Sequence, residues 1–241
     1  LWNSPLLRSQ VTSEDVRPPE MLFGYLIGPF GALLASGIFT SQLQNYLTNV
    51  LKLDLGFLTT LQLLSTILIV AANLVVGQLI ERTRTLAGKA RPWILLSALM
   101  LSVASVLMFI VPFADRTARM VWIAIAYNAY YAVGFPIYNT ATSTLVPVST
   151  RNSKQRSTLA SLTNIASLGV MGVGSMIFPT LVSMALKEDQ HLWFVAMLGV
   201  AIFTALTILL QFRYTRERVT EESAGAEKAE KSSASLGEQV K

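Results

Sequence analysis

The sequence lacks cysteine, has a single histidine and is poor in charged residues, which make up 14% of its 241 positions. Without cysteine it has no disulfide framework, thiolate nucleophile or sulfur-ligated metal site. The lone His191 cannot form a histidine metal cluster either. We therefore expect neither a hydrolytic nor a redox enzyme, and no resident cofactor or metal.

Hydrophobic residues make up 52% of the chain. In soluble domains charged residues make up about a quarter of the sequence, which is well above their share here. About 20 mostly apolar residues in a helix span the 30 Å core of a bilayer. Six runs reach this length without an interior charge or histidine; they cover residues 22–47, 57–80, 92–113, 120–147, 157–185 and 192–212. The sequence thus predicts an all-α membrane protein with six transmembrane helices.

Lysine and arginine gather in alternate connections between the runs. One set holds Arg8, Arg17, Arg82, Arg84, Lys89, Arg91, Arg151, Lys154, Arg156, Arg213, Arg216 and Arg218; the other holds Lys52, Arg116, Arg119 and Lys187. The positive-inside rule places the first set, and both termini, in the cytoplasm. We expect a plasma (inner) membrane protein whose net charge of +5 faces lipid rather than nucleic acid.

The six predicted spans divide the chain into three segments. Residues 1–20 form a cytoplasmic N-terminal segment, residues 21–213 the bundle, and residues 214–241 a flexible cytoplasmic tail or inter-domain linker. Trp93, Trp122 and Trp193 lie near the beginnings of runs, and we interpret them as interfacial anchors.

Four of the six runs carry a polar stripe at helical spacing, and the third and sixth carry only scattered Ser and Thr. The stripes are Ser36, Gly37, Thr40 and Gln44; Thr59, Gln62, Thr66, Asn73 and Gly77; Asn128, Tyr131, Tyr138, Asn139 and Thr142; and Ser157, Ser161, Asn164 and Ser175. An unpaired amide in hydrocarbon costs several kcal/mol, so these faces meet other helices or water. Interhelical hydrogen bonding explains any one of them, whereas the four together favour a hydrated solute pathway.

The most specific string is GQLIERTR at Gly77–Arg84, followed by GKARPW at Gly88–Trp93. Its bases satisfy the positive-inside rule, but an acid beside fixed bases at a helix end also suits a state-dependent charge network. The candidate residues of this conformational gate are Gly77, Glu81, Arg82, Arg84, Gly88, Lys89, Arg91 and Pro92.

From Phe23 to Arg213 the chain resembles the amino-terminal half of a major facilitator superfamily (MFS) transporter, most closely the glycoside–pentoside–hexuronide:cation symporters of the melibiose permease group. The resemblance rests on the Gly77–Trp93 string, on YLTNVLKL at Tyr46–Leu53 and on TLVP at Thr144–Pro147 with the basic loop that follows. It implies two inverted three-helix repeats, with the first, second, fourth and fifth helices around the cavity. The four polar stripes fall on those same helices.

The resemblance also implies that the charged cavity residues of the family are replaced here. Family acids align with Leu33, Ile69, Asn73 and Asn139, a tryptophan with Ser143 and an arginine with Asn164. Neutral oxygens can hold Na⁺, but amides cannot take up and release a proton at physiological pH. Either the coupling acid lies in a partner half, or transport is passive, or the bundle does not transport.

We therefore expect half of a secondary transporter that moves a neutral, sugar-like solute by alternating access, facing a second six-helix bundle. A non-transporting scaffold or receptor subunit and an MFS lipid or drug transporter are the alternatives. The candidate cavity residues are Leu33, Thr40, Gln44, Gln62, Thr66, Ile69, Asn73, Asn128, Tyr131, Tyr138, Asn139, Ser143 and Asn164.

Overall fold

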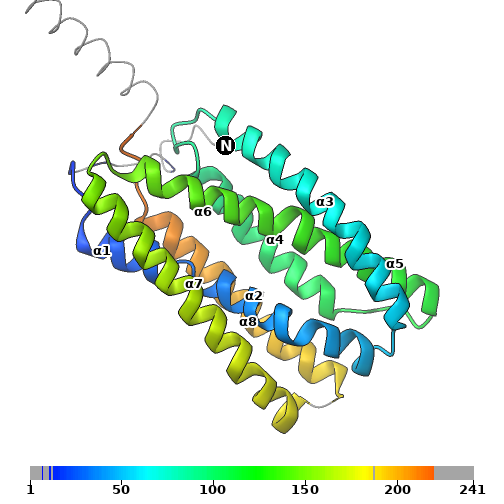
Figure 1. Cartoon of the computed structure of the whole chain (residues 1–241). Helices are drawn as coiled ribbons and strands as arrows, with labels where there is room; N and C mark the ends of the chain where they lie inside the picture. The colour runs from blue at the N-terminus through cyan, green and yellow to red at the C-terminus, as the bar shows by residue number, and fades with distance from the viewer. Residues whose placement is uncertain (1–6, 8–10, 12, 187, 220–241) are drawn as a thin grey trace, which may run out of the picture.

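The computed structural model describes residues 7, 11, 13–186 and 188–219, without the side chain of Ser183 (Figure 1). All regular structure within these residues is helical. Six helical stretches are long and apolar enough to cross a membrane: Pro18–Val50, Leu55–Arg82, Arg91–Phe109, Arg116–Ser149, Ser153–Leu186 and Gln190–Tyr214. The prediction of six membrane-spanning helices is confirmed.

Three stretches combine α-helix with π-helical turns. The elements are α1 (Pro18–Glu20), a π segment (Met21–Ile27), α2 (Phe30–Asn45), a π segment (Tyr46–Val50), α3 (Leu55–Arg82), α4 (Arg91–Phe109), α5 (Arg116–Asn128), a π segment (Ala129–Gly134), α6 (Phe135–Ser149), α7 (Ser153–Leu181), a π segment (Val182–Leu186) and α8 (Gln190–Tyr214). Pro136 lies directly after the third π segment, where its missing N–H interrupts the regular hydrogen-bond ladder.

Polar caps explain why four of the stretches begin before the apolar runs that predict them. Asp54, Asp115, Asn152 and Asp189 precede α3, α5, α7 and α8, and their side-chain oxygens accept backbone N–H bonds of 2.8 to 3.4 Å. Each cap satisfies donors that the first helical turn leaves without a partner.

The helices pack in pairs that respect a twofold repeat. α2 packs against α7, α3 against α6 and α4 against α8, with further contacts of α2 with α8 and of α4 with α6 (Figure 1). Exchanging the first three membrane-spanning stretches with the last three converts the α2–α7 contact into the α3–α6 contact and the α2–α8 contact into the α4–α6 contact. The α4–α8 contact is converted into itself. This symmetry is expected of two inverted three-helix repeats.

Close helix approach depends on glycine. A Cβ on Gly31 would lie 2.3 Å from Thr207 Oγ1 and 2.4 Å from Thr204 Cα. Both threonines bond to Gly31 instead: its N–H donates to Thr207 Oγ1 at 3.1 Å, and Thr204 Oγ1 donates to its carbonyl oxygen at 3.0 Å. On the other side of α2, a Cβ on Gly37 would lie 2.5 Å from the carbonyl oxygen of Met171 in α7.

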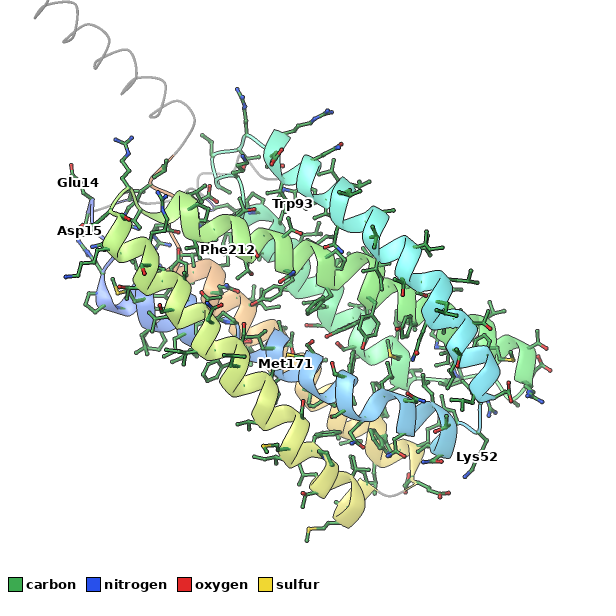
Figure 2. The ribbon with its side chains drawn as sticks, in the orientation of Figure 1. Glu14, Asp15, Lys52, Trp93, Met171 and Phe212 are labelled. Atoms are coloured by element: carbon green, nitrogen blue, oxygen red, sulfur yellow. The ribbon has the colours of Figure 1, made fainter. Side chains whose placement is uncertain are left out.

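The core contains a cluster of aromatic side chains. Trp193 is fully buried against Tyr46, Phe109 and Phe178, with ring centroids 5.2 to 6.1 Å apart. Its interpretation as an interfacial anchor is wrong, because tertiary packing covers the whole ring. This cluster lies toward the end of the bundle that carries Lys52, opposite the end that carries Glu14 and Asp15 (Figure 2).

Candidate functional site

A pocket of about 380 Å³ lies between α2, α6 and α7. Its lining is Pro29, Leu33, Tyr138, Asn139, Thr142, Ser143, Val146, Pro147, Ala160, Thr163, Asn164 and Ser167. Pro29 and Leu33 come from the start of α2, while the rest belong to α6, which ends at Ser149, and to the half of α7 that begins at Ser153. The pocket therefore lies between the middle of the bundle and the end where α6 meets α7.

The pocket brings together five of the thirteen predicted cavity residues. They are Leu33, Tyr138, Asn139, Ser143 and Asn164. Four of these align with charged or aromatic residues of the resembled family. They come from three different helices, so the shared cavity is a product of tertiary packing and not of one stripe.

The other eight predicted residues lie outside this pocket. Thr40 and Gln44 are exposed further along the first stretch, and the second stretch contributes nothing to the pocket lining. Of the four candidates in the second stretch, Gln62, Thr66 and Asn73 are exposed and Ile69 is half-buried. In the fourth stretch, Asn128 and Tyr131 are half-buried.

Several of these outlying side chains bond to their own helix. Thr40 and Thr66 Oγ1 each donate to the carbonyl oxygen four residues earlier at 2.8 Å, as does Asn73 Nδ2. Asn128 Nδ2 does the same at 2.9 Å. Such bonds satisfy polar groups without a partner helix, so a polar stripe by itself does not identify a cavity wall.

Tyr131 has the contacts of a packing residue. Its ring centroid lies 4.5 Å from that of Tyr127, 5.0 Å from Tyr130 and 6.5 Å from Phe39. Tyr138 differs, because its ring lines the pocket and its hydroxyl donates to Gln211 Oε1 of α8 at 3.2 Å. Of the two predicted tyrosines, only Tyr138 borders the cavity.

The pocket offers hydrogen bonds without charge. All its lining side chains are neutral, and seven of them end in a hydroxyl or an amide. Among the described residues there is also no group of three or more His, Cys, Asp or Glu that could hold a metal ion. The arrangement suits a neutral polar molecule, since nothing in the lining compensates a buried charge.

Sequence reasoning overlooked three residues here. Thr163 and Ser167 line the pocket, and Gln211 supports it from α8. Ser167 follows Asn164 by three positions, so helical periodicity would have found it. Gln211 gave no such signal, because it is an isolated amide in a helix without a polar stripe.

The gate motif divides into two environments. Glu81 and Arg82 end α3 and are exposed, as is Arg84. Beyond them, the Glu217 carboxylate accepts the backbone N–H groups of Lys89, Ala90 and Arg91 at 2.6, 2.9 and 3.0 Å. Glu217 therefore caps the N-terminus of α4, where Pro92 forms the first turn.

Gly88 is the position where the motif requires glycine. Its φ is +112°, and a Cβ there would lie 2.4 Å from Glu217 Oε1. By contrast, a Cβ on Gly77 in α3 would meet nothing within 4 Å. The two glycines of the motif therefore have different roles.

Arg91 is buried and serves as an anchor. Its Nη1 donates to Ala87 O at 3.0 Å and to Leu7 O at 3.2 Å, and its Nη2 donates to Phe212 O at 3.1 Å. The guanidinium carbon also lies 4.5 Å from the centroid of the Phe212 ring. These contacts join α4 to the end of α8.

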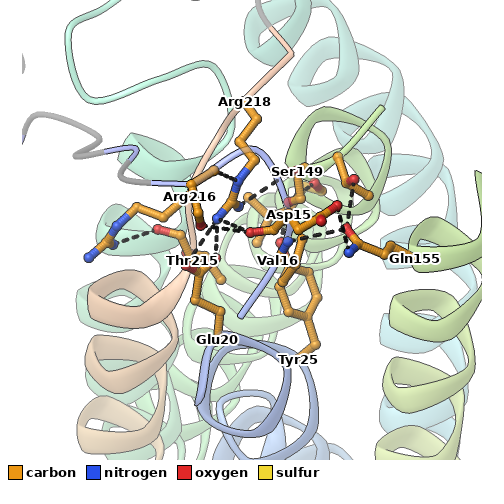
Figure 3. Close-up of polar contacts among 12 residues, drawn as sticks. Asp15, Val16, Glu20, Tyr25, Ser149, Gln155, Thr215, Arg216 and Arg218 are labelled. Carbon is orange, nitrogen blue, oxygen red and sulfur yellow. Dashed lines mark hydrogen bonds and ion pairs between the residues drawn. The ribbon is translucent and has the colours of Figure 1, made fainter. Parts of the chain in front are cut away.

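The residues after α8 continue along this end of the bundle (Figure 3). Arg218 Nη2 contacts both oxygens of Glu20 at 3.0 and 2.8 Å, and Nε donates to Ser13 O at 2.9 Å. The backbone N–H groups of Arg218 and Val219 both donate to Val148 O at 2.9 Å. The described part of the predicted flexible tail, Thr215–Val219, is thus fixed to the bundle, while residues 220–241 lie outside the described residues.

The predicted N-terminal segment is also held where it is described. Gln155 at the start of α7 donates to Asp15 Oδ1 at 2.9 Å, and its Oε1 accepts the N–H of Val16 at 3.1 Å (Figure 3). A cavity of about 570 Å³ lies beside this contact, lined in part by Asp15, Arg151 and Arg218. Burial is the main cause that lowers the pKa of the neighbouring Arg216, and the Glu20 carboxylate opposes that shift.

Comparison with known proteins identifies the family. Residues 24–241 match the family described as MFS/sugar transport protein. The chain is 26% identical to the isoprimeverose transporter of Lactiplantibacillus pentosus over 88% of its own length and 44% of the relative. It is 25% identical to the uncharacterized symporter YjmB of Bacillus subtilis, over 87% and 45%, and 27% identical to the inner membrane symporter YicJ of Escherichia coli, over 72% and 38%.

The chain thus spans less than half the length of these relatives. The relatives are transporters, and the six apolar stretches make this chain an integral membrane protein. Both findings agree with the resemblance read from the sequence. The chain belongs to the family of MFS/sugar transport proteins.

Proposed function

We propose that the chain is the N-terminal half of a secondary transporter that moves a neutral, sugar-like solute by alternating access. The pocket between α2, α6 and α7 carries this proposal, because its lining combines hydroxyl and amide groups with an absence of charge. Polyhydroxylated neutral molecules match such a lining. The name of the isoprimeverose transporter supports the sugar class, and the symporter relatives support a coupled carrier.

A facing six-helix bundle completes the pathway, either later in the same protein or in a second chain. Thr40 and Gln44 of α2, and Gln62 and Asn73 of α3, are exposed on the bundle. Exposed amides are costly against lipid, so they need water or another bundle beside them. Together with Thr66, Ile69, Asn128 and Tyr131, these four make up the eight predicted residues outside the pocket. All eight remain our candidates for the part of the solute pathway that the facing bundle completes.

Coupling, where it occurs, depends on the facing bundle. Asn73 and Asn139 occupy positions where the resembled family has acids, and neither amide exchanges protons at physiological pH. A proton-coupling acid therefore belongs to the other half, whereas Na⁺ remains compatible with neutral oxygens. We place both termini in the cytoplasm and the bundle in the plasma (inner) membrane.

The gate function belongs to the exposed part of the Gly77–Pro92 motif. Glu81 and Arg82 are accessible to a facing bundle, while Gly88, Lys89 and Arg91 are held by the bundle itself. A charge network that forms in one conformation and breaks in another needs accessible partners. The second part of the motif, Gly88–Pro92, would then hold these exposed residues in a fixed position on the bundle.

Uptake of isoprimeverose into proteoliposomes tests the proposal. Vesicles hold the chain alone or the chain with its facing bundle, and the pocket variant Asn164→Leu is compared with Gln190→Leu, which changes an exposed amide at the start of α8, outside the pocket and the candidate pathway. We expect uptake only with both bundles, and a loss of at least tenfold for Asn164→Leu alone.

Other outcomes point to the alternatives. Transport by a monodisperse chain of 241 residues would contradict the facing bundle. A stable complex with another membrane protein, without flux of any sugar, would favour a scaffold or receptor subunit. Competition by amphiphiles but not by glycosides would favour a lipid or drug transporter.

A further inference from the structure

The inner wall of the pocket contains two hydroxyl groups one helical turn apart on α6. Tyr138 is 3% exposed and Thr142 is 8% exposed, and both line the pocket. The Tyr138 hydroxyl donates to Gln211 Oε1 at 3.2 Å. Its proton therefore points toward α8, and its lone pairs are available on the pocket side.

Thr142 differs from two other threonines of these helices. Thr144 and Thr163 donate to the carbonyl oxygen four residues earlier, at 2.8 and 3.0 Å. Thr142 Oγ1 is buried beside the Tyr138 hydroxyl and makes no hydrogen bond of normal geometry among the described residues. A buried hydroxyl without a partner costs free energy, which a ligand that bonds to it would recover.

Gln211 is held rigidly behind Tyr138. It is fully buried, and a Cβ on Gly28 would lie 2.6 Å from its Cβ, so the first membrane-spanning stretch leaves this side chain little freedom. Its amide oxygen sets the direction of the Tyr138 hydroxyl. Gln211 does not line the pocket, so it acts on the pocket only through Tyr138.

We infer that Thr142 contacts the solute through its hydroxyl, and that Gln211 is a positioning residue that orients Tyr138 beside it. Tyr138 then accepts a hydrogen bond from a solute hydroxyl while Thr142 donates to or accepts from the same part of the solute. This inference rests on the proposed function and narrows it: the inner end of the pocket recognises a hydroxyl group. An alkyl chain at this place would leave the Thr142 hydroxyl without a ligand partner and the Tyr138 oxygen without a donor.

Binding measurements on the chain together with its facing bundle, in lipid nanodiscs, test this role. Saturation-transfer NMR with isoprimeverose, melibiose and xylose identifies the sugar that binds most tightly, and its monodeoxy analogues follow. The variants are Thr142→Val and Thr142→Ser, Gln211→Met and Gln211→Glu, with Thr144→Val as the matched control because that hydroxyl is already bonded within α6.

We expect one monodeoxy analogue to bind the wild-type chain five- to tenfold more weakly than the parent sugar. Thr142→Val and Gln211→Met should reduce that ratio to below twofold, while Thr142→Ser, Gln211→Glu and Thr144→Val keep it. Without sugar, Thr142→Val should not lower the melting temperature, because it removes no hydrogen bond.

Three results would overturn the inference. An unchanged sugar-to-deoxy ratio in Thr142→Val contradicts the role of Thr142 while leaving the proposed function intact. A melting temperature that falls in Thr142→Val without sugar shows a structural role instead. Failure of all three sugars to bind the wild-type chain in the presence of its facing bundle contradicts the proposed function, and this inference with it.

Discussion

At the scale of single residues, the two glycines of the gate motif show how position decides what a side chain must be. Gly88 has a positive φ and lies against the Glu217 carboxylate, whereas Gly77 lies in a helix with open space around it. Only the first depends on the conformational freedom of glycine.

Gly88→Ala should therefore destabilise the bundle while Gly77→Ala should not. A β-carbon at positive φ costs about 1–3 kcal/mol, and its contact with Glu217 adds to this. Gly77→Ala should stabilise α3 by up to about 1 kcal/mol, because alanine favours helix. Thermal unfolding in detergent compares the two, and equal melting temperatures would contradict the role assigned to Gly88.

At the scale of elements, the bundle depends on close contact between α2 and α8. Gly31 permits this contact, since a Cβ there would meet the backbone of Thr204 as well as the side chain of Thr207. Gly169 on α7 has no atom within 4 Å of its Cβ position.

Gly31→Ala should lower the free energy of unfolding by about 1–3 kcal/mol, because the two helices must separate to admit the methyl group. Gly169→Ala is the matched control and should be neutral or slightly stabilising. The readout is the denaturation midpoint of each purified variant. Tolerance of alanine at Gly31 would mean that α2 and α8 are further apart than described.

The cap on α4 gives a second prediction at this scale. Glu217→Ala removes the acceptor for three backbone N–H groups, two of them buried, and should cost about 2 kcal/mol. Glu188→Ala is the control, because its ion pair with Lys52 is exposed and should contribute less than about 1 kcal/mol. Melting curves of both variants decide whether the carboxylate acts as a cap or only as surface charge.

Sequence reasoning reached some elements of the site and not others, for a physical reason. Helical periodicity is local, so it grouped Tyr138, Asn139 and Thr142 on α6 correctly. It also predicted a polar wall on α3, but that helix packs against α6 away from the pocket. Which stripes meet in one cavity is decided by tertiary packing.

The long-range contacts could not be predicted from the sequence. Gln211 meets Tyr138 across 73 positions, and Glu217 meets the start of α4 across 126 to 128. Neither residue belongs to a periodic pattern that singles it out. The number of membrane-spanning helices was predictable, because it depends only on the length and composition of each run.

At the scale of the whole molecule, the topology can be tested with single cysteines, since the chain has none of its own. Thr117 and Ser153 are exposed at the starts of α5 and α7, at opposite ends of the bundle. With both termini in the cytoplasm, Thr117→Cys should react with a membrane-impermeant maleimide in intact cells.

Ser153→Cys should react only after the membrane is permeabilised. The degree of labelling on gels measures both sites, and permeabilised cells provide the positive control for each. The reverse pattern would invert the orientation predicted from the distribution of lysine and arginine.

The anchoring of Thr215–Val219 also has a mechanical consequence. A pull on the chain beyond Val219 first reaches Val148, Glu20 and the cap on α4, because these contacts lie between the tail and α8. The load is therefore shared among the ends of several helices instead of unwinding one. A force on Val219 therefore acts on α1, α4, α6 and α8 together.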